Sequence, residues 1–298
     1  MTSHARGIVL MLVSMLGFAL GDAAVKVLGP VIGPGTMILA FGAGGVLIFY
    51  AMALATRESI PWRRGLHPAI LARNVVELVA VIAMVTSLTL LPITLVTAVT
   101  QSVPIIALAG AALFLGERVG WRKWIAVAVA MVGVLVMIAP WDAGITATIA
   151  LPIVASVFLA ARDVLTRMIP DGIPNAALAL WGNIAVALGG VSYLMVTGEP
   201  VVIPSPFSAA MVWLIAAVLF GAVGYYAVTA SVRLAPVSVV TPFRYTRLLF
   251  AAGLGTVLFG ERPGAEVWLG ALLVVAAGLY AILRGEASHA VPQAPSPR

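Results

Sequence analysis

The chain has 298 residues, of which 62% are apolar and only 9% are charged, and its net charge is +6. A soluble domain carries about 25% charged residues, and 17 basic plus 11 acidic side chains are too few to cover a soluble surface of this size. The composition excludes soluble, disordered and fibrous proteins and indicates an integral membrane protein. A nucleic-acid partner is not expected, because a basic patch needs a polar surface. Cysteine is absent, which excludes disulfides and thiol-based metal sites.

Apolar runs follow one another along the whole chain. The hydrocarbon core of a bilayer is about 30 Å thick, so a spanning helix needs about 20 mostly apolar residues. Turn signals and charge clusters divide the sequence into ten such segments: 7–28, 33–54, 69–90, 92–115, 121–139, 148–169, 174–196, 208–231, 236–259 and 265–284. We therefore predict an all-α integral membrane protein with ten transmembrane helices. The Pro-rich segment 286–298 is predicted to be a disordered cytoplasmic tail.

The basic residues between these segments predict the orientation. With the N-terminus in the cytoplasm, the outer connections contain only Lys26 and Arg262. The inner connections and ends then contain Arg6, Arg57, Arg63, Arg64, Arg118, Arg122, Lys123, Arg167, Arg233, Arg284 and Arg298. Because basic residues concentrate on the cytoplasmic side, both termini are predicted to lie in the cytoplasm, with the protein in a bacterial inner membrane.

The two halves of the sequence resemble each other. The stretch from Pro92 through Gly116-Glu117-Arg118 to Trp124 matches the stretch from Pro236 through Gly260-Glu261-Arg262 to Trp268, at a constant offset of 144. Each unit holds five predicted spans, an odd number, so the second copy must be inverted in the membrane. We predict two inverted five-helix repeats, 1–145 and 146–285, an organisation found in many secondary transporters. The repeated glutamates are expected to pair or to cap helix ends at the hairpins.

These motifs resemble the EamA branch of the drug/metabolite transporter superfamily. The resemblance rests on the two Gly-Glu-Arg segments and on Thr241-Pro242-Phe243-Arg244-Tyr245 with Gly278-Leu279-Tyr280. It implies a ten-helix inner-membrane carrier of small organic solutes, with a central cavity between the halves. Many members of that family export amino acids and related metabolites, and others import compounds such as riboflavin.

Ionisable residues inside the predicted spans are the first candidates for the site, because a charge at a helix centre costs about 3 kcal/mol on insertion scales. There are seven: Asp22, Arg73, Glu77, Arg162, Asp163, Arg244 and Arg247. Arg244 and Arg247, with Thr241 on the same face and Tyr245 adjacent, form a candidate site for a carboxylate or phosphate. The alternative is that both arginines form structural ion pairs. Arg73 and Glu77 are spaced i,i+4, which is typical of a self-neutralising pair and also permits a proton-coupling role for Glu77.

Two further i,i+4 pairs occupy equivalent places in the repeats, Asp22 with Lys26 and Asp163 with Arg167. Their symmetry favours gating or structural ion pairs over contact with a substrate. Uncharged side chains complete the candidate substrate site: Thr100, Gln101, Trp181, Asn183 and Tyr225. For each aromatic residue, ordinary packing is the alternative.

The predicted function is secondary active transport of an amino acid, a derivative or a similar anionic or zwitterionic solute by alternating access. Import of a vitamin-like aromatic heterocycle such as riboflavin is the alternative. A membrane-embedded enzyme is disfavoured, because the three histidines lie outside the spans and the acidic residues form no metal-binding cluster. No cofactor or metal is expected. The expected partners are a small solute, the lipid bilayer and, as a candidate coupling ion, the proton; substrate, direction and oligomeric state stay open.

Overall fold

A computed structural model describes residues 3–114, 121–138, 147–169, 172–234 and 241–285. All regular structure in these residues is helical, as predicted. The first half contains α1 (Ser3–Leu28), α2 (Pro34–Thr56), α3 (Pro68–Leu90), α4 (Ile93–Thr100), α5 (Val103–Phe114) and α6 (Trp121–Ile138). The second contains α7 (Ala150–Arg167), α8 (Asn175–Thr197), α9 (Ala209–Leu234), α11 (Thr246–Phe259) and α12 (Ala265–Gly285). Short 3-10 turns are η1 (Trp62–Leu66), η2 (Ala147–Ile149) and η3 (Thr241–Tyr245).

Six of the described helical segments are long and apolar enough to cross a membrane, and they belong to α1, α2, α3, α7, α8 and α9. Shorter apolar segments lie at Ile93–Ala107 and Ala265–Ala277. The chain is therefore a multi-pass membrane protein. The predicted Gly116-Glu117-Arg118 hairpin and the predicted tail 286–298 fall outside the described residues.

The predicted span 92–115 is interrupted near its middle. Helix α4 ends at Thr100, α5 begins at Val103, and Gln101 and Ser102 form a turn between them. Pro104 accounts for the interruption, because its ring lacks an N–H and collides with the carbonyl four residues earlier. The Ser102 hydroxyl donates a 2.7 Å hydrogen bond to the Val99 carbonyl, which occupies a backbone acceptor at the break.

The described part of the predicted span 236–259 is not one continuous α-helix. Residues 241–245 form the 3-10 turn η3, the regular α-helix begins at Thr246, and residues 236–240 lie outside the described part of the chain. The Thr246 hydroxyl donates a 2.7 Å hydrogen bond to the Phe243 carbonyl at this junction. Two irregular segments, one in each half, therefore lie within stretches that composition alone reads as continuous helices.

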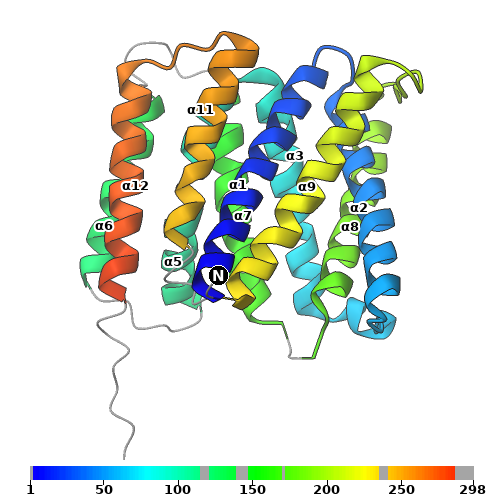
Figure 1. Cartoon of the computed structure of the whole chain (residues 1–298), viewed down its shortest axis with the longest axis horizontal. Coiled ribbons are helices and arrows are strands. Elements are labelled where there is room, and N and C mark those ends of the chain that lie inside the picture. The colour runs from blue at the N-terminus through cyan, green and yellow to red at the C-terminus, as the bar shows by residue number, and fades with distance from the viewer. Residues whose placement is uncertain (1–2, 115–120, 139–146, 170–171, 235–240, 286–298) are drawn as a thin grey trace, which may run out of the picture.

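The helices run side by side, with the α6–α12 pair at one end of the bundle and the α2–α8 pair at the other (Figure 1). The most extensive contacts join α1 with α9, α2 with α8, α3 with α7, and α6 with α12. Each of these pairs takes one helix from each half of the sequence. The largest buried apolar cluster also draws on both halves, from Leu28 and Met37 to Val186 and Ala251. The halves consequently share one core.

The α2–α8 contact depends on reciprocal glycines. A Cβ atom on Gly42 would overlap the backbone nitrogen of Ala187, and a Cβ on Gly190 would overlap the backbone nitrogen of Leu39. Small residues allow helix backbones to approach closely in a membrane, where van der Waals packing takes the place of a hydrophobic driving force. Close packing of α2 against α8 therefore holds together one end of the bundle.

The first prediction concerns this close contact. Gly42→Ala should destabilise the protein by about 1–3 kcal/mol, the usual cost of overpacking, because the added methyl meets backbone atoms that cannot move aside. Gly253→Ala is the matched control, since a Cβ there meets no atom within 4 Å and alanine favours a helix over glycine. Thermal unfolding in detergent measures both. Equal midpoints for the two variants would contradict the proposed packing.

Candidate functional site

A cavity with a volume of about 320 Å³ lies between helices of the bundle. Helices from both halves line it, and most of the lining is apolar. The ionisable and polar side chains among the lining residues are Asp22, Arg73, Glu77, Thr100, Gln101, Arg162, Asn183, Tyr225, Arg244 and Arg247. An apolar cavity with a few convergent polar groups is the usual form of a small-molecule site.

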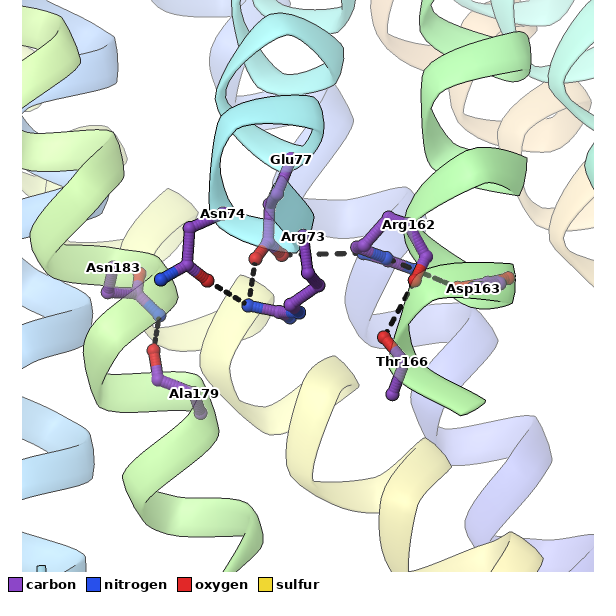
Figure 2. Close-up of polar contacts among 8 residues, drawn as sticks. All are labelled: Arg73, Asn74, Glu77, Arg162, Asp163, Thr166, Ala179 and Asn183. Carbon is purple, nitrogen blue, oxygen red and sulfur yellow. Dashed lines mark hydrogen bonds and ion pairs between the residues drawn. The ribbon is translucent and has the colours of Figure 1, made fainter. Parts of the chain in front are cut away.

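Glu77 on α3 connects two arginines from different halves of the chain (Figure 2). Its Oε2 atom lies 2.5 Å from Nη1 of Arg73, and its Oε1 atom lies 3.5 Å from Nη1 of Arg162 on α7. Arg162 Nη2 also lies 2.8 Å from Oδ1 of Asp163, and Arg73 Nη1 donates a 2.9 Å hydrogen bond to Asn74. Two arginines and two carboxylates thus form a neutral chain of ion pairs across α3 and α7. The Arg73 side chain is only 2% exposed.

A second ion pair crosses between the halves on another wall of the cavity. Nη2 of Arg247 on α11 donates a 2.5 Å hydrogen bond to Oδ2 of Asp22 on α1. The Arg247 guanidinium also lies over the ring of Phe18, 5.2 Å from its centroid, in cation–π geometry. Asp22 therefore neutralises Arg247, and the pair holds α1 against α11.

Arg244 differs from the other cavity arginines. Within the described ranges no carboxylate lies within the 4.0 Å ion-pair distance of its guanidinium. Asp163 acts on Arg244 electrostatically, but that carboxylate is in contact with Arg162. The seven ionisable residues predicted inside spans comprise four arginines and three acids, and the unmatched charge is on Arg244.

The break between α4 and α5 lies in the cavity wall and contacts η3. Thr100 and Gln101 line the cavity, together with Val103 and Pro104. The Gln101 side-chain amide donates a 3.0 Å hydrogen bond to the Tyr245 carbonyl. Irregular backbone at membrane depth occurs where it lines a cavity or is buried in protein, and broken helices form the solute sites of many transporters.

Not every residue predicted for the site faces the cavity. Trp181 packs with Ile70, Ala177 and Leu178 in a separate apolar cluster, and Tyr245 is 5% exposed and absent from the described lining. Lys26 lies near the end of α1, where it contacts Glu261. Asp163 is absent from the described lining but contacts the lining residue Arg162. Thr241 belongs to η3 and Arg167 ends α7, and their side chains are outside the described part.

The sequence prediction also missed part of the lining. Three phenylalanines, Phe18, Phe41 and Phe49, line the cavity from α1 and α2, and Phe49 meets Tyr225 edge to face at 5.4 Å between centroids. Apolar rings in an apolar helix carry no signal that distinguishes lining from packing. Arg162 was identified as an ionisable residue inside a predicted span, but it was not assigned to the site.

Comparison with known proteins identifies the family. The EamA-like transporter family matches the chain twice, over residues 5–139 and 146–283. The chain belongs to this family. A riboflavin transporter of Rhizobium johnstonii is 27% identical over 78% of this chain and 73% of its own length. An S-adenosylmethionine uptake transporter of Rickettsia felis is 23% identical over 61% of this chain and 60% of its own length.

The fold of this EamA chain also matches a solved crystal structure. The TM-score is 0.65 at 16% identity, over 96% of this chain and 99% of the other. The predicted resemblance to the family is confirmed, and the names of family and relatives describe transporters of small molecules rather than enzymes.

The second prediction tests the ion-pair chain. Glu77→Gln keeps the side-chain volume but leaves Arg73 and Arg162 without their shared carboxylate, and removing one partner of a buried pair costs about 3–5 kcal/mol. The thermal midpoint should fall by several degrees. Glu58→Gln, at an exposed glutamate after α2, is the control and should leave the midpoint unchanged. A Glu77→Gln midpoint equal to that of the control would rule out a stabilising role for the chain of pairs.

Proposed function

We propose that this EamA transporter moves a small anionic or zwitterionic organic solute, such as an amino acid or a derivative, through the central cavity. The observation that carries the proposal is Arg244, which lines the cavity and has no carboxylate within ion-pair distance among the described residues. A guanidinium offers a planar fork of donors that matches a carboxylate or phosphate. The solute's anionic group would supply the partner that Arg244 lacks.

Alternating access between two inverted repeats is the proposed mechanism, and the helix pairing supports it. If the two halves exchange places, α1 takes the position of α7 and α9 takes the position of α3. The α1–α9 contact then becomes the α3–α7 contact, and both contacts are present. The α2–α8, α4–α11 and α6–α12 contacts each map onto themselves. A bundle with such pairing allows the halves to exchange conformations, which opens the cavity to each side in turn. In the proposed orientation both termini lie in the cytoplasm of a bacterial cell.

A flat heterocycle is the second candidate substrate. Four aromatic rings line the cavity: Phe18, Phe41, Phe49 and Tyr225. Stacking and apolar contact would suit a ring system. The similarity to riboflavin and S-adenosylmethionine transporters supports this candidate, because both of those solutes contain flat heterocycles. A solute with both a ring and an anionic group would satisfy the two candidates together.

The third prediction separates these candidates. Purified protein is mixed with amino acids, S-adenosylmethionine, riboflavin and decarboxylated analogues, and thermal stabilisation is measured. Anionic or zwitterionic solutes should stabilise the wild type, and Arg244→Gln should weaken their binding at least tenfold, since a hydrogen bond to a charged group contributes about 1.5–3 kcal/mol. Arg262→Gln, at an exposed arginine outside the cavity, is the matched control.

The opposite pattern would contradict the proposal. If riboflavin stabilises the wild type and Arg244→Gln equally, and no anionic solute binds, the heterocycle is the substrate and Arg244 has no binding role. Uptake into proteoliposomes then identifies the transported solute.

The fourth prediction concerns the energy source. Two carboxylates in the cavity, Asp22 and Glu77, are the candidate proton acceptors for coupled transport. If protons drive transport, proteoliposome uptake should fall to the level of simple equilibration when ionophores collapse both the pH gradient and the membrane potential. Accumulation that continues after both are collapsed would exclude protons as the driving ion.

A further inference from the structure

The side chain of Glu261, in the connection between α11 and α12, binds the beginning of α4 in the other half of the chain. Its Oε1 atom accepts a 2.8 Å hydrogen bond from the backbone N–H of Ile93. Its Oε2 atom accepts hydrogen bonds from the N–H and the hydroxyl of Thr94, at 3.1 and 2.9 Å. We call these three hydrogen bonds the Glu261 cap.

Local sequence explains why α4 needs a cap from elsewhere. The first N–H groups of a helix have no partner within it and are usually bound by a side chain at the N-cap position. In α4 that position is Pro92, which provides no side-chain hydrogen bond. A carboxylate is well suited to the vacant place, because the positive end of the helix dipole also attracts it. Glu261, distant in sequence, takes the role of the local capping residue.

The end of α11 presents Glu261 to this place. The helix stops at Gly260, whose φ of 63° lies in the left-handed region that glycine adopts readily. The Glu261 N–H then donates a 3.0 Å hydrogen bond to the Gly255 carbonyl. Gly255 also leaves room for the cap, because a Cβ there would lie 2.6 Å from Oε2 of Glu261 and 2.8 Å from the Thr94 hydroxyl.

Lys26, close to the end of α1, joins the cap from a third direction. Its Nζ atom lies 3.3 Å from Oε1 of Glu261 and donates a 2.6 Å hydrogen bond to the Leu91 carbonyl. The ammonium also lies 5.3 Å from the centroid of the Phe259 ring. One turn earlier on α1, Asp22 binds Arg247. Two ion pairs therefore bind α1 to the α11 segment. Asp22 with Arg247 lies at the cavity, and Lys26 with Glu261 lies at the end of α1.

The cap lies close to part of the cavity wall. Val25 and Leu88 line the cavity and are close in sequence to Lys26 and Leu91, which take part in the network. We infer that Glu261 is a positioning residue in transport: by capping α4 from the opposite half, it keeps the cavity closed on the side where α1 ends. This inference rests on the proposed transport function. Opening on that side, predicted to face outward, requires the α11–α12 connection to leave α4.

Cysteine labelling tests the closure without knowledge of the substrate. The chain has no cysteine, so Leu88→Cys introduces a single thiol in the cavity wall. A membrane-impermeant thiol reagent is applied to intact cells and to inside-out vesicles. With Glu261→Gln, labelling from the side where α1 ends should accelerate at least tenfold, because glutamine cannot bind Lys26 and both backbone N–H groups as a carboxylate does. Glu266→Gln, at an acid near the start of α12 that is outside the cap, is the matched control and should change nothing.

A charge exchange distinguishes capping from a simple ion pair. In Lys26→Glu with Glu261→Lys, the opposite charges remain, but an ammonium cannot accept hydrogen bonds from the N–H groups of Ile93 and Thr94. The exchange should therefore leave labelling fast. If it restores slow labelling, the cap inference is wrong. Thr94→Val removes one hydrogen bond of the cap and keeps the backbone N–H groups at the start of α4. It should give a smaller acceleration of labelling, and it replaces Glu261→Gln as the test variant if that protein does not fold.

The readouts separate this inference from the proposed function. If folded Glu261→Gln and the parent protein label at the same rate, closure by Glu261 is refuted even where transport is observed. If labelling accelerates as expected but no solute is bound or moved, the closure stands as a property of the fold, and transport of the proposed solute is refuted.

Discussion

The scarcity of water inside a bilayer favours the pairing of a buried guanidinium with a carboxylate. A charge at the centre of a membrane is expensive unless it is paired or faces a wet cavity. Three of the ion pairs among the described residues join opposite halves of the chain: Glu77 with Arg162, Asp22 with Arg247, and Glu261 with Lys26. These three pairs offset the cost of the charges and also bind the halves together. Any relative movement of the halves must therefore rearrange ion pairs at the cavity.

This requirement gives a physical reason for a polar cavity in the middle of an apolar bundle. Charged pairs buried in a dry core cost more than they return unless their geometry is very good, whereas pairs at a cavity can exchange partners with water or a solute. Arg162 already contacts two carboxylates, Glu77 and Asp163. A solute anion near Arg244 would enter this set of charges and change which pairs are strongest, so that binding would bias the arrangement of the halves.

Sequence reasoning predicted the features that depend on composition and spacing. The helical fold, the family and the ionisable residues that surround the cavity follow from apolar runs, the Gly-Glu-Arg motifs and the cost of charge in lipid. Features that depend on contacts between residues far apart in the sequence could not be predicted. The Gly-Glu-Arg repeat predicted that Glu261 pairs or caps a helix end at its own hairpin, but not that it caps α4, where Ile93 is 168 positions away. Trp181 and Tyr245 have the composition of site residues, but their faces of the helices pack elsewhere.

The candidate site arises where the two repeats stop being equivalent. At the sequence offset of 144, Thr100 corresponds to Arg244 and Gln101 to Tyr245. The second of these pairs meets directly, because the Gln101 amide donates to the Tyr245 carbonyl. Thr100 and Arg244 both line the cavity, but only one of them is charged. Two identical repeats would present two arginines there, whose repulsion would oppose close approach of the halves. A single arginine leaves one unmatched positive charge at the centre of the bundle, and an anionic solute can neutralise it.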